Sequence, residues 1–149
     1  MPDVISALEV HSSVHAACPT NGQVGKRVAV QTLQAMLKRS LNLLRSVEYR
    51  FCPDPNCPTV YYSVDGAQTF AETDLREQVF QKHPEDVDGL VCYCFQHTLR
   101  ELGTDGENIV REINQGVEQH QCACTIRNPQ GSCCLGNVNS LVKHLQAVQ

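Results

Sequence analysis

The sequence predicts an α+β chain, in which a small zinc-ribbon-like part with short strands precedes a helical part. Short runs of β-branched and aromatic residues alternate with Pro- and Asn-containing turns in the first half. Apolar residues recur at helical spacing in the second half. The 9 cysteines fall in both halves, and only 5% of residues are aromatic, so bound metals are expected to support a modest aliphatic core.

The first half is predicted to form four short strands around one helix. The strands are expected at residues 28–30, 49–52, 59–63 and 69–70. Leucines at helical spacing predict a helix over residues 32–46, with Thr32 as its N-cap. A short helix or turn is expected over residues 75–81.

The second half is predicted to consist of helices joined by cysteine-bearing loops. Residues 92–94 are expected in a loop, followed by a short helix over residues 98–102. A capping box at residues 104–107 predicts the start of another helix. A long cysteine-rich loop is expected over residues 122–136, and a last helix from residue 137 to the end.

These patterns divide the chain into four segments. They are a leader at 1–17, a zinc-ribbon-like part at 18–83, a polar linker at 84–90 and a helical part at 91–149. The leader lacks the basic and long apolar regions of a signal peptide, and no segment is apolar enough to span a membrane. An odd number of cysteines also fits poorly with disulfide pairing, so the sequence predicts a cytoplasmic protein with thiolate–metal chemistry.

Charge and motifs exclude several classes of function. The net charge is −4 and no basic run occurs, which disfavours nucleic-acid binding. An acidic surface would instead suit a basic protein redox partner. No phosphate-binding loop and no nucleophile–base pair stands out, so we predict no catalytic residues. An electron carrier is expected rather than an enzyme, and metal-ion reduction is the one activity left open.

Six cysteines in the second half suggest a [2Fe–2S] cluster, which requires four thiolates. Cys92 and Cys94 would lie on the same side of an extended loop and hold one end of the cluster. Residues 122–134 must supply the other two ligands, and spacing alone leaves their identity open. Adjacent Cys133 and Cys134 point apart, so one of them is expected to bind. A zinc site and disulfides are the alternatives. His97 is read as a surface histidine.

The first half contains candidate zinc ligands on two turns, as in a zinc ribbon. The turn after Cys18 contains Pro and Asn-Gly, and the second turn runs from Cys52 to Cys57. His15 is predicted as the fourth ligand because His-x-x-Cys spacing can chelate a metal. A water ligand, or loss of zinc, is the alternative.

Together these motifs resemble the N-terminal domain of the CopZ-type copper chaperones. The resemblance rests on Val91-Cys-Tyr-Cys-Phe95, on Asn128-Pro-x-Gly-x-Cys-Cys134, and on Cys52-x4-Cys57 leading into Val60-Tyr-Tyr62. It covers nearly the whole chain after about residue 18. The motifs are specific in combination and weak individually.

The resemblance implies a zinc-binding part followed by a helical [2Fe–2S] part similar to the bacterioferritin-associated ferredoxin fold. Residue by residue, it implies cluster ligation by Cys92, Cys94, Cys124 and Cys134. Cys122 and Cys133 would then be spare thiols near the cluster. The family usually has Cys-x-x-Cys in the first zinc turn, whereas this sequence has Asn21 at the second cysteine position.

The resemblance also implies a role in copper handling. Full-length CopZ chaperones carry an additional heavy-metal-binding domain with its own Cys-x-x-Cys, and this sequence contains no such motif. We therefore expect a [2Fe–2S] electron-transfer protein that serves the reduction or handling of copper or another metal, with copper ions or a copper chaperone as further partners. The alternatives are a redox- or cluster-sensing adaptor that binds a protein through its zinc part, and a structural module with two zinc ions.

Overall fold

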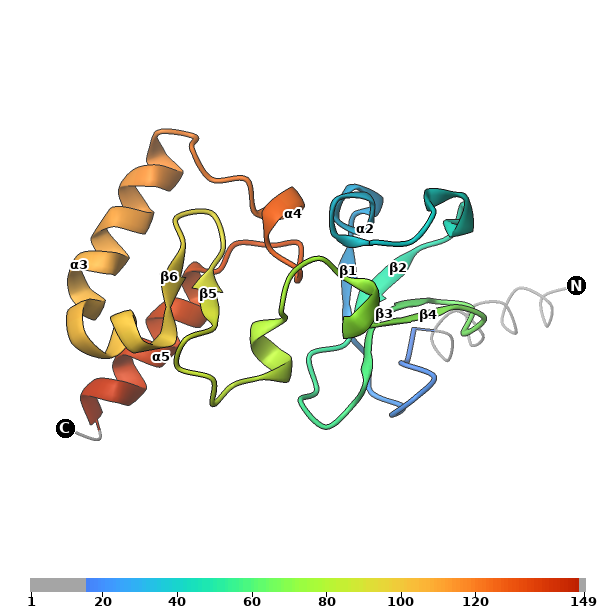
Figure 1. Cartoon of the computed structure of the whole chain (residues 1–149), viewed down its shortest axis with the longest axis horizontal. Coiled ribbons are helices and arrows are strands. Elements are labelled where there is room, and N and C mark those ends of the chain that lie inside the picture. Colours follow the sequence, from blue (N-terminus) through green and yellow to red (C-terminus); the bar gives the residue numbers. More distant parts are fainter. Residues whose placement is uncertain (1–15, 148–149) are drawn as a thin grey trace, which may run out of the picture.

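The structure is a computed structural model that describes residues 16–147. It confirms the predicted α+β class, with an antiparallel sheet in the first half and helices in the second (Figure 1). The predicted leader lies almost entirely outside the described residues. Each half has its own apolar core, and the predicted linker at 84–90 stays a prediction. Within the described range, no helix is both long and apolar enough to cross a membrane.

The sheet is formed by four antiparallel strands in chain order. They are β1 (Lys26–Val28), β2 (Tyr49–Phe51), β3 (Thr59–Ser63) and β4 (Thr69–Ala71). All five residues of β3 are buried, which identifies it as the central strand of this half. Because neighbouring side chains of a strand point to opposite faces, Tyr61 enters the main core of this half while Tyr62 packs with Cys18, Cys52 and Cys57.

The predicted helix at 32–46 is wrong in length and in its start. Helix α2 covers Val30–Met36, its N-cap is Ala29, and Thr32 lies buried inside it. The chain leaves the helix because Lys38 N–H donates to the Asp74 carbonyl and Arg76 N–H donates to the Met36 carbonyl, both at 2.8 Å. This pairing outweighs the local helical spacing of the leucines. After α2, the predicted helix is reduced to a single 3-10 turn, η1 (Leu41–Leu43).

Two short 3-10 turns lie at the two ends of the range 75–81, where a short helix or turn was predicted. They are η2 (Glu72–Asp74) and η3 (Phe80–Lys82). The turn η3 contacts both halves of the molecule. Phe80 packs against the helical core, and Lys82 Nζ donates to the carbonyls of Asp54 (2.7 Å) and Cys57 (2.9 Å) in the sheet half.

The helical half begins with a hairpin, so the prediction of a loop at 92–94 is wrong in part. Strand β5 (Leu90–Cys92) pairs with β6 (His97–Thr98). Two helices were predicted after this point, and α3 (Leu99–Glu118) contains both, joined across a kink at Asp105. Thr98 and Glu101 form the capping box at its start. The cysteine-rich segment contains the short α4 (Cys124–Arg127), and α5 (Leu135–Ala147) packs on α3.

The α4 segment joins the two halves, and Figure 1 shows α4 lying beside α2. The Thr32 hydroxyl of α2 donates to the Thr125 carbonyl at 2.6 Å, and the Tyr61 hydroxyl of β3 donates to the Pro129 carbonyl. Gly131 has φ +74°, and a Cβ there would lie 2.9 Å from Thr32 Oγ1. Glycine is therefore required where the cysteine-rich loop approaches the sheet half.

Candidate metal centres

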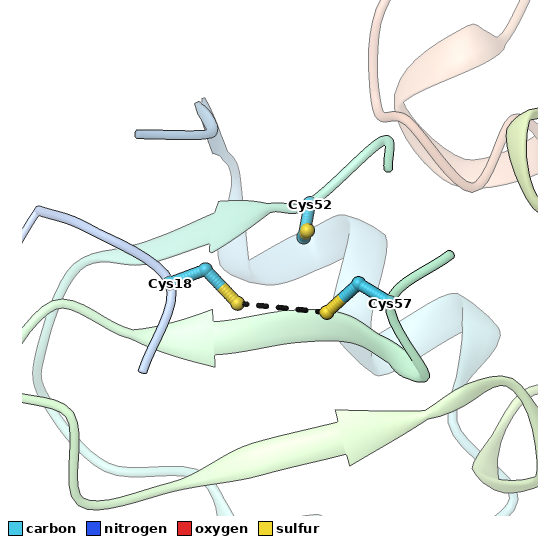
Figure 2. A group of neighbouring side chains, drawn as sticks. All are labelled: Cys18, Cys52 and Cys57. Carbon is cyan, nitrogen blue, oxygen red and sulfur yellow. Dashed lines mark hydrogen bonds between the residues drawn. The ribbon is translucent and has the colours of Figure 1, made fainter. Parts of the chain in front are cut away.

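Three thiols of the sheet half converge on one point. Cys18 precedes β1, Cys52 directly follows β2, and Cys57 lies just before β3, so two turns present all three sulfurs (Figure 2). The Sγ atoms lie within 4.8 Å of one another, and those of Cys18 and Cys57 are 4.0 Å apart. Sulfurs that share a tetrahedral zinc with bonds of about 2.3 Å lie about 3.8 Å apart. The three-thiol site (Cys18, Cys52 and Cys57) therefore has the spacing that zinc requires.

The surroundings of the three-thiol site shift the pKa values of Cys18 and Cys52 in opposite directions. All three cysteines are buried against Tyr62. Burial opposes ionisation of Cys18, but hydrogen bonds from the backbone of Asn21 and Thr20 outweigh it and lower the pKa of this thiol. Burial raises the pKa of Cys52 to about 11. A cation would replace the protons that the buried thiols otherwise retain.

Asn21 is the polar side chain that sequence analysis placed at the family's fourth cysteine. Its Nδ2 donates to Cys52 Sγ at 3.3 Å and to Asp54 Oδ2 at 3.1 Å. Its Oδ1 accepts a hydrogen bond from Gln23 N–H at 2.9 Å. The predicted fourth ligand, His15, lies outside the described residues, so its ligation stays a prediction.

The helical half brings together the four thiols that the resemblance implied. Cys92 ends β5, Cys94 lies in the following turn, Cys124 begins α4, and Cys134 directly precedes α5. Cys92, Cys124 and Cys134 are buried, and Cys94 is half-buried. We call this group the four-thiol site. Its members come from three separate segments, which only the folded chain assembles.

Close contacts link the sulfurs of the four-thiol site in a series. The Sγ atoms of Cys94 and Cys124 are 3.4 Å apart. Cys134 forms thiol–thiol hydrogen bonds with both Cys92 and Cys124. These contacts lower the pKa of Cys92 to about 7 and that of Cys124 to about 5, and they raise the pKa of Cys134. The thiols of this site therefore share their protons unequally, as closely coupled groups do.

Backbone amides orient the sulfurs of the four-thiol site. Ala123 N–H donates to Cys94 Sγ at 3.1 Å, and a backbone hydrogen bond from Phe95 also lowers the pKa of Cys92. Tyr93 points away from the sulfurs, and its hydroxyl donates to the Gln78 carbonyl at 2.5 Å. Phe95 packs on Gly116 of α3, where a Cβ would lie 2.1 Å from the ring. The turn that carries Cys92 and Cys94 is therefore anchored on both of its sides.

The remaining thiols and His97 surround the four-thiol site. Cys133 is exposed and Cys122 is half-buried. Cys133 forms a hydrogen bond with Cys124, so it lies at the edge of the site. The reading of His97 as a surface residue is wrong. It is buried opposite Cys92 in the hairpin, with Nε2 3.1 Å from Glu112 Oε2 and Nδ1 3.4 Å from Glu101 Oε2.

The donor sets of the two sites fit two different metal groups. Four thiols with backbone N–H···S bonds match the donor set of a [2Fe–2S] cluster. Three thiols on two turns match a zinc site that lacks one ligand. Sequence reasoning missed Lys82, whose ammonium group holds the second turn of the three-thiol site. Its only sequence signal was a basic residue within a segment expected to be a short helix or turn.

Comparison with known proteins supports the assignment of zinc to the sheet half. Residues 15–76 match the CopZ zinc binding domain family. The fold is similar to the X-ray structure of the Archaeoglobus fulgidus CopZ N-terminal domain, at 26% sequence identity and a TM-score of 0.67. That similarity covers 84% of this chain and 96% of the other. No curated protein sequence is significantly similar to the chain. The sequence match over the sheet half and the structural match over both halves confirm that this chain is similar to a CopZ N-terminal domain.

Proposed function

We propose that this chain, which is similar to a CopZ N-terminal domain, handles metal, binds zinc and is a [2Fe–2S] electron carrier. The convergence of Cys92, Cys94, Cys124 and Cys134 carries the proposal, because four thiols linked in a series of close contacts are the donor set that such a cluster requires. The hairpin β5–β6, with α3 and α5, would form its fold, of the bacterioferritin-associated ferredoxin type. A bound cluster would accept and release one electron at a time.

The protein side chains have distinct roles in this proposal. Cys92 and Cys94 would hold one side of the cluster from the hairpin, and Cys124 and Cys134 would hold the other from the cysteine-rich segment. Cys134 gives up the proton that it shares with Cys92 and Cys124 when the group binds. The amide of Ala123 donates to Cys94 Sγ, and such bonds stabilise the thiolate and raise the reduction potential.

The zinc part would stabilise the sheet half rather than take part in electron transfer. Zinc has no redox chemistry, and the strands that surround the three-thiol site are only three to five residues long. The electrons would serve the reduction or handling of copper or another metal. The similarity to a CopZ N-terminal domain supports this assignment, as do the two thiol-rich sites. The acceptor would be a protein redox partner or a copper ion.

An anaerobic preparation tests the electron carrier. Iron, sulfide and zinc are assayed, and EPR spectra are recorded before and after reduction with dithionite. We expect about two irons and two sulfides per chain, with an S = 1/2 signal that appears only on reduction. Protein that contains two zinc ions and no iron, even after reconstitution with iron and sulfide, would exclude electron transfer and leave a structural module.

A redox- or cluster-sensing adaptor is the second candidate, and the exposure of Cys133 beside the four-thiol site favours it. A sensor would use reactive thiols at the edge of the cluster. Replacement of both Cys122 and Cys133 by Ser separates the two functions. An electron carrier keeps its iron content and its rate of electron transfer, whereas a thiol sensor loses its response to oxidants.

A further inference from the structure

The two turns of the three-thiol site provide three cysteines. At the fourth position, where the CopZ family usually has a cysteine, this chain has Asn21. Among the described residues, the group of metal-ligating side chains at this point comprises Cys18, Cys52 and Cys57, with no further histidine, cysteine or carboxylate. Asn21 lies against the same sulfurs and is half-buried. The identity of the fourth donor therefore depends on what Asn21 can do.

Hydrogen bonds engage both ends of the Asn21 side chain. Oδ1 accepts from Gln23 N–H, which can only donate. Nδ2 donates to the carboxylate of Asp54, which can only accept, and also to Cys52 Sγ. These partners orient the amide so that its NH2 group faces the sulfur. An amide NH2 group is a donor and not a metal ligand, so Asn21 cannot be the fourth ligand in this orientation.

Charge at the site favours a neutral fourth donor. Zn²⁺ and three thiolates carry a net charge of −1, and a fourth thiolate would raise it to −2 in a buried position. The nearby Asp54 carboxylate and Lys82 ammonium offset each other. The N–H···S bond from Asn21 would then disperse part of the charge on the Cys52 sulfur.

We propose that zinc at this site would have three thiolate ligands and one exchangeable water molecule. Asn21 is the positioning residue, because it directs Cys52 Sγ and occupies the place of a fourth thiolate. This inference rests on zinc binding by the three-thiol site. The experiment below separates a water ligand from His15, the fourth ligand that the sequence predicts.

The test is ¹¹³Cd NMR of the full-length protein, because each site gives its own resonance. The resonance of the three-thiol site is identified by its loss in Cys52→Ser. In tetrahedral thiolate sites, replacement of sulfur by nitrogen or oxygen shifts the resonance to lower frequency. We expect the wild-type resonance at lower frequency than that of Asn21→Cys, which restores a fourth thiolate. Zinc transfer to a chelator should be at least about tenfold faster from the wild type.

Three variants and one titration identify the donor. If free imidazole moves the wild-type resonance but not that of Asn21→Cys, the donor is exchangeable and comes from solution. If His15→Ala moves the resonance, the fourth ligand is His15 and the proposal is wrong. Asn21→Ala should retain the resonance position of a three-thiolate site but release zinc faster than the wild type. A faster release of zinc from Asn21→Ala would show the positioning role of Asn21 by itself, because this variant has the same number of thiolate ligands as the wild type.

Two further results would overturn the proposal in different ways. A wild-type resonance identical to that of Asn21→Cys would show a fourth thiolate, supplied by another cysteine, and would leave zinc binding intact. Absence of any metal resonance that depends on Cys52, in both the wild type and Asn21→Cys, would instead exclude zinc binding at this site. The two failures are therefore distinguishable.

Discussion

The two thiol sites of this chain are assembled in different ways. The three-thiol site depends on two turns around a small antiparallel sheet, and its sulfurs already have the spacing of a tetrahedral metal site. The four-thiol site depends on a hairpin turn, the start of α4 and the residue before α5, and its sulfurs are linked by shared hydrogen bonds. The first site supports a weak sheet, whereas the second site requires both the helical core and its contact with the sheet half.

This difference predicts which changes affect one site and which affect both. Loss of a ligand should empty its own site. Loss of a contact between the halves should weaken both. The following predictions run from the largest expected effect to the smallest.

Cys134→Ser should abolish iron binding, whereas Cys133→Ser should retain it. Cys134 is 1% exposed and contacts both Cys92 and Cys124, while its neighbour is exposed. Iron analysis after anaerobic reconstitution should fall from about two irons per chain to near zero in the first variant only. The opposite pattern, with iron lost in Cys133→Ser, would assign the ligand to the exposed cysteine.

Removal of zinc by a strong chelator should destabilise the sheet half more than the helical half. Structural zinc contributes about 10–16 kcal/mol of apparent binding free energy in zinc-finger peptides, and this sheet has three strands of only three residues. Hydrogen exchange should show loss of protection in β2 and β3 and retention in α3. Cys52→Ser should reproduce the effect without chelator. Equal loss of protection in both halves would mean that they unfold as one unit.

Lys82→Met should lower the free energy of unfolding by about 1.5–3 kcal/mol, because a charged donor to two carbonyls is lost. Its Nζ bonds to Asp54 and Cys57 join η3, which packs on the helical core, to the second turn of the three-thiol site. Denaturant titration measures the change, and Lys143→Met, on the exposed face of α5, is the control. A variant as stable as the control would show that the halves are not joined through Lys82.

The smallest effect is expected from the exposed ion pair of Arg45 and Asp65. A hydrogen bond from Arg45 holds the pKa of Asp65 well below its ordinary value of 3.8. A carboxyl with a depressed pKa stabilises the fold above its unfolded-state pKa, and this contribution is lost as pH falls through the folded-state pKa. Asp65→Asn should therefore lower the melting temperature slightly at neutral pH, and the difference should vanish on acidification. A difference that grows at low pH would contradict this sign.

Local sequence patterns predicted the strands well and one helix poorly. Residues 59–63 were predicted as a strand and form β3 with the same bounds, because β-branched and aromatic residues lie between two turns rich in Pro, Asn and Gly. The leucines at 32–46 predicted a long helix, but α2 ends at Met36, where the backbone pairs with Asp74 and Arg76. Helical periodicity carries no information about a pairing partner so distant in the sequence.

The sequence by itself determined the α+β class, the two groups of cysteines and the turns that carry them, because residue type and short-range spacing decide turns and strands. Only the tertiary structure decided which thiols meet, that Cys134 is buried while Cys133 is exposed, and that His97 lies inside the hairpin. It also decided that Asn21 donates to Cys52 and that Lys82 joins the halves. The physical reason is that these contacts join residues far apart in the chain, and only packing of the two cores brings their side chains within hydrogen-bond distance.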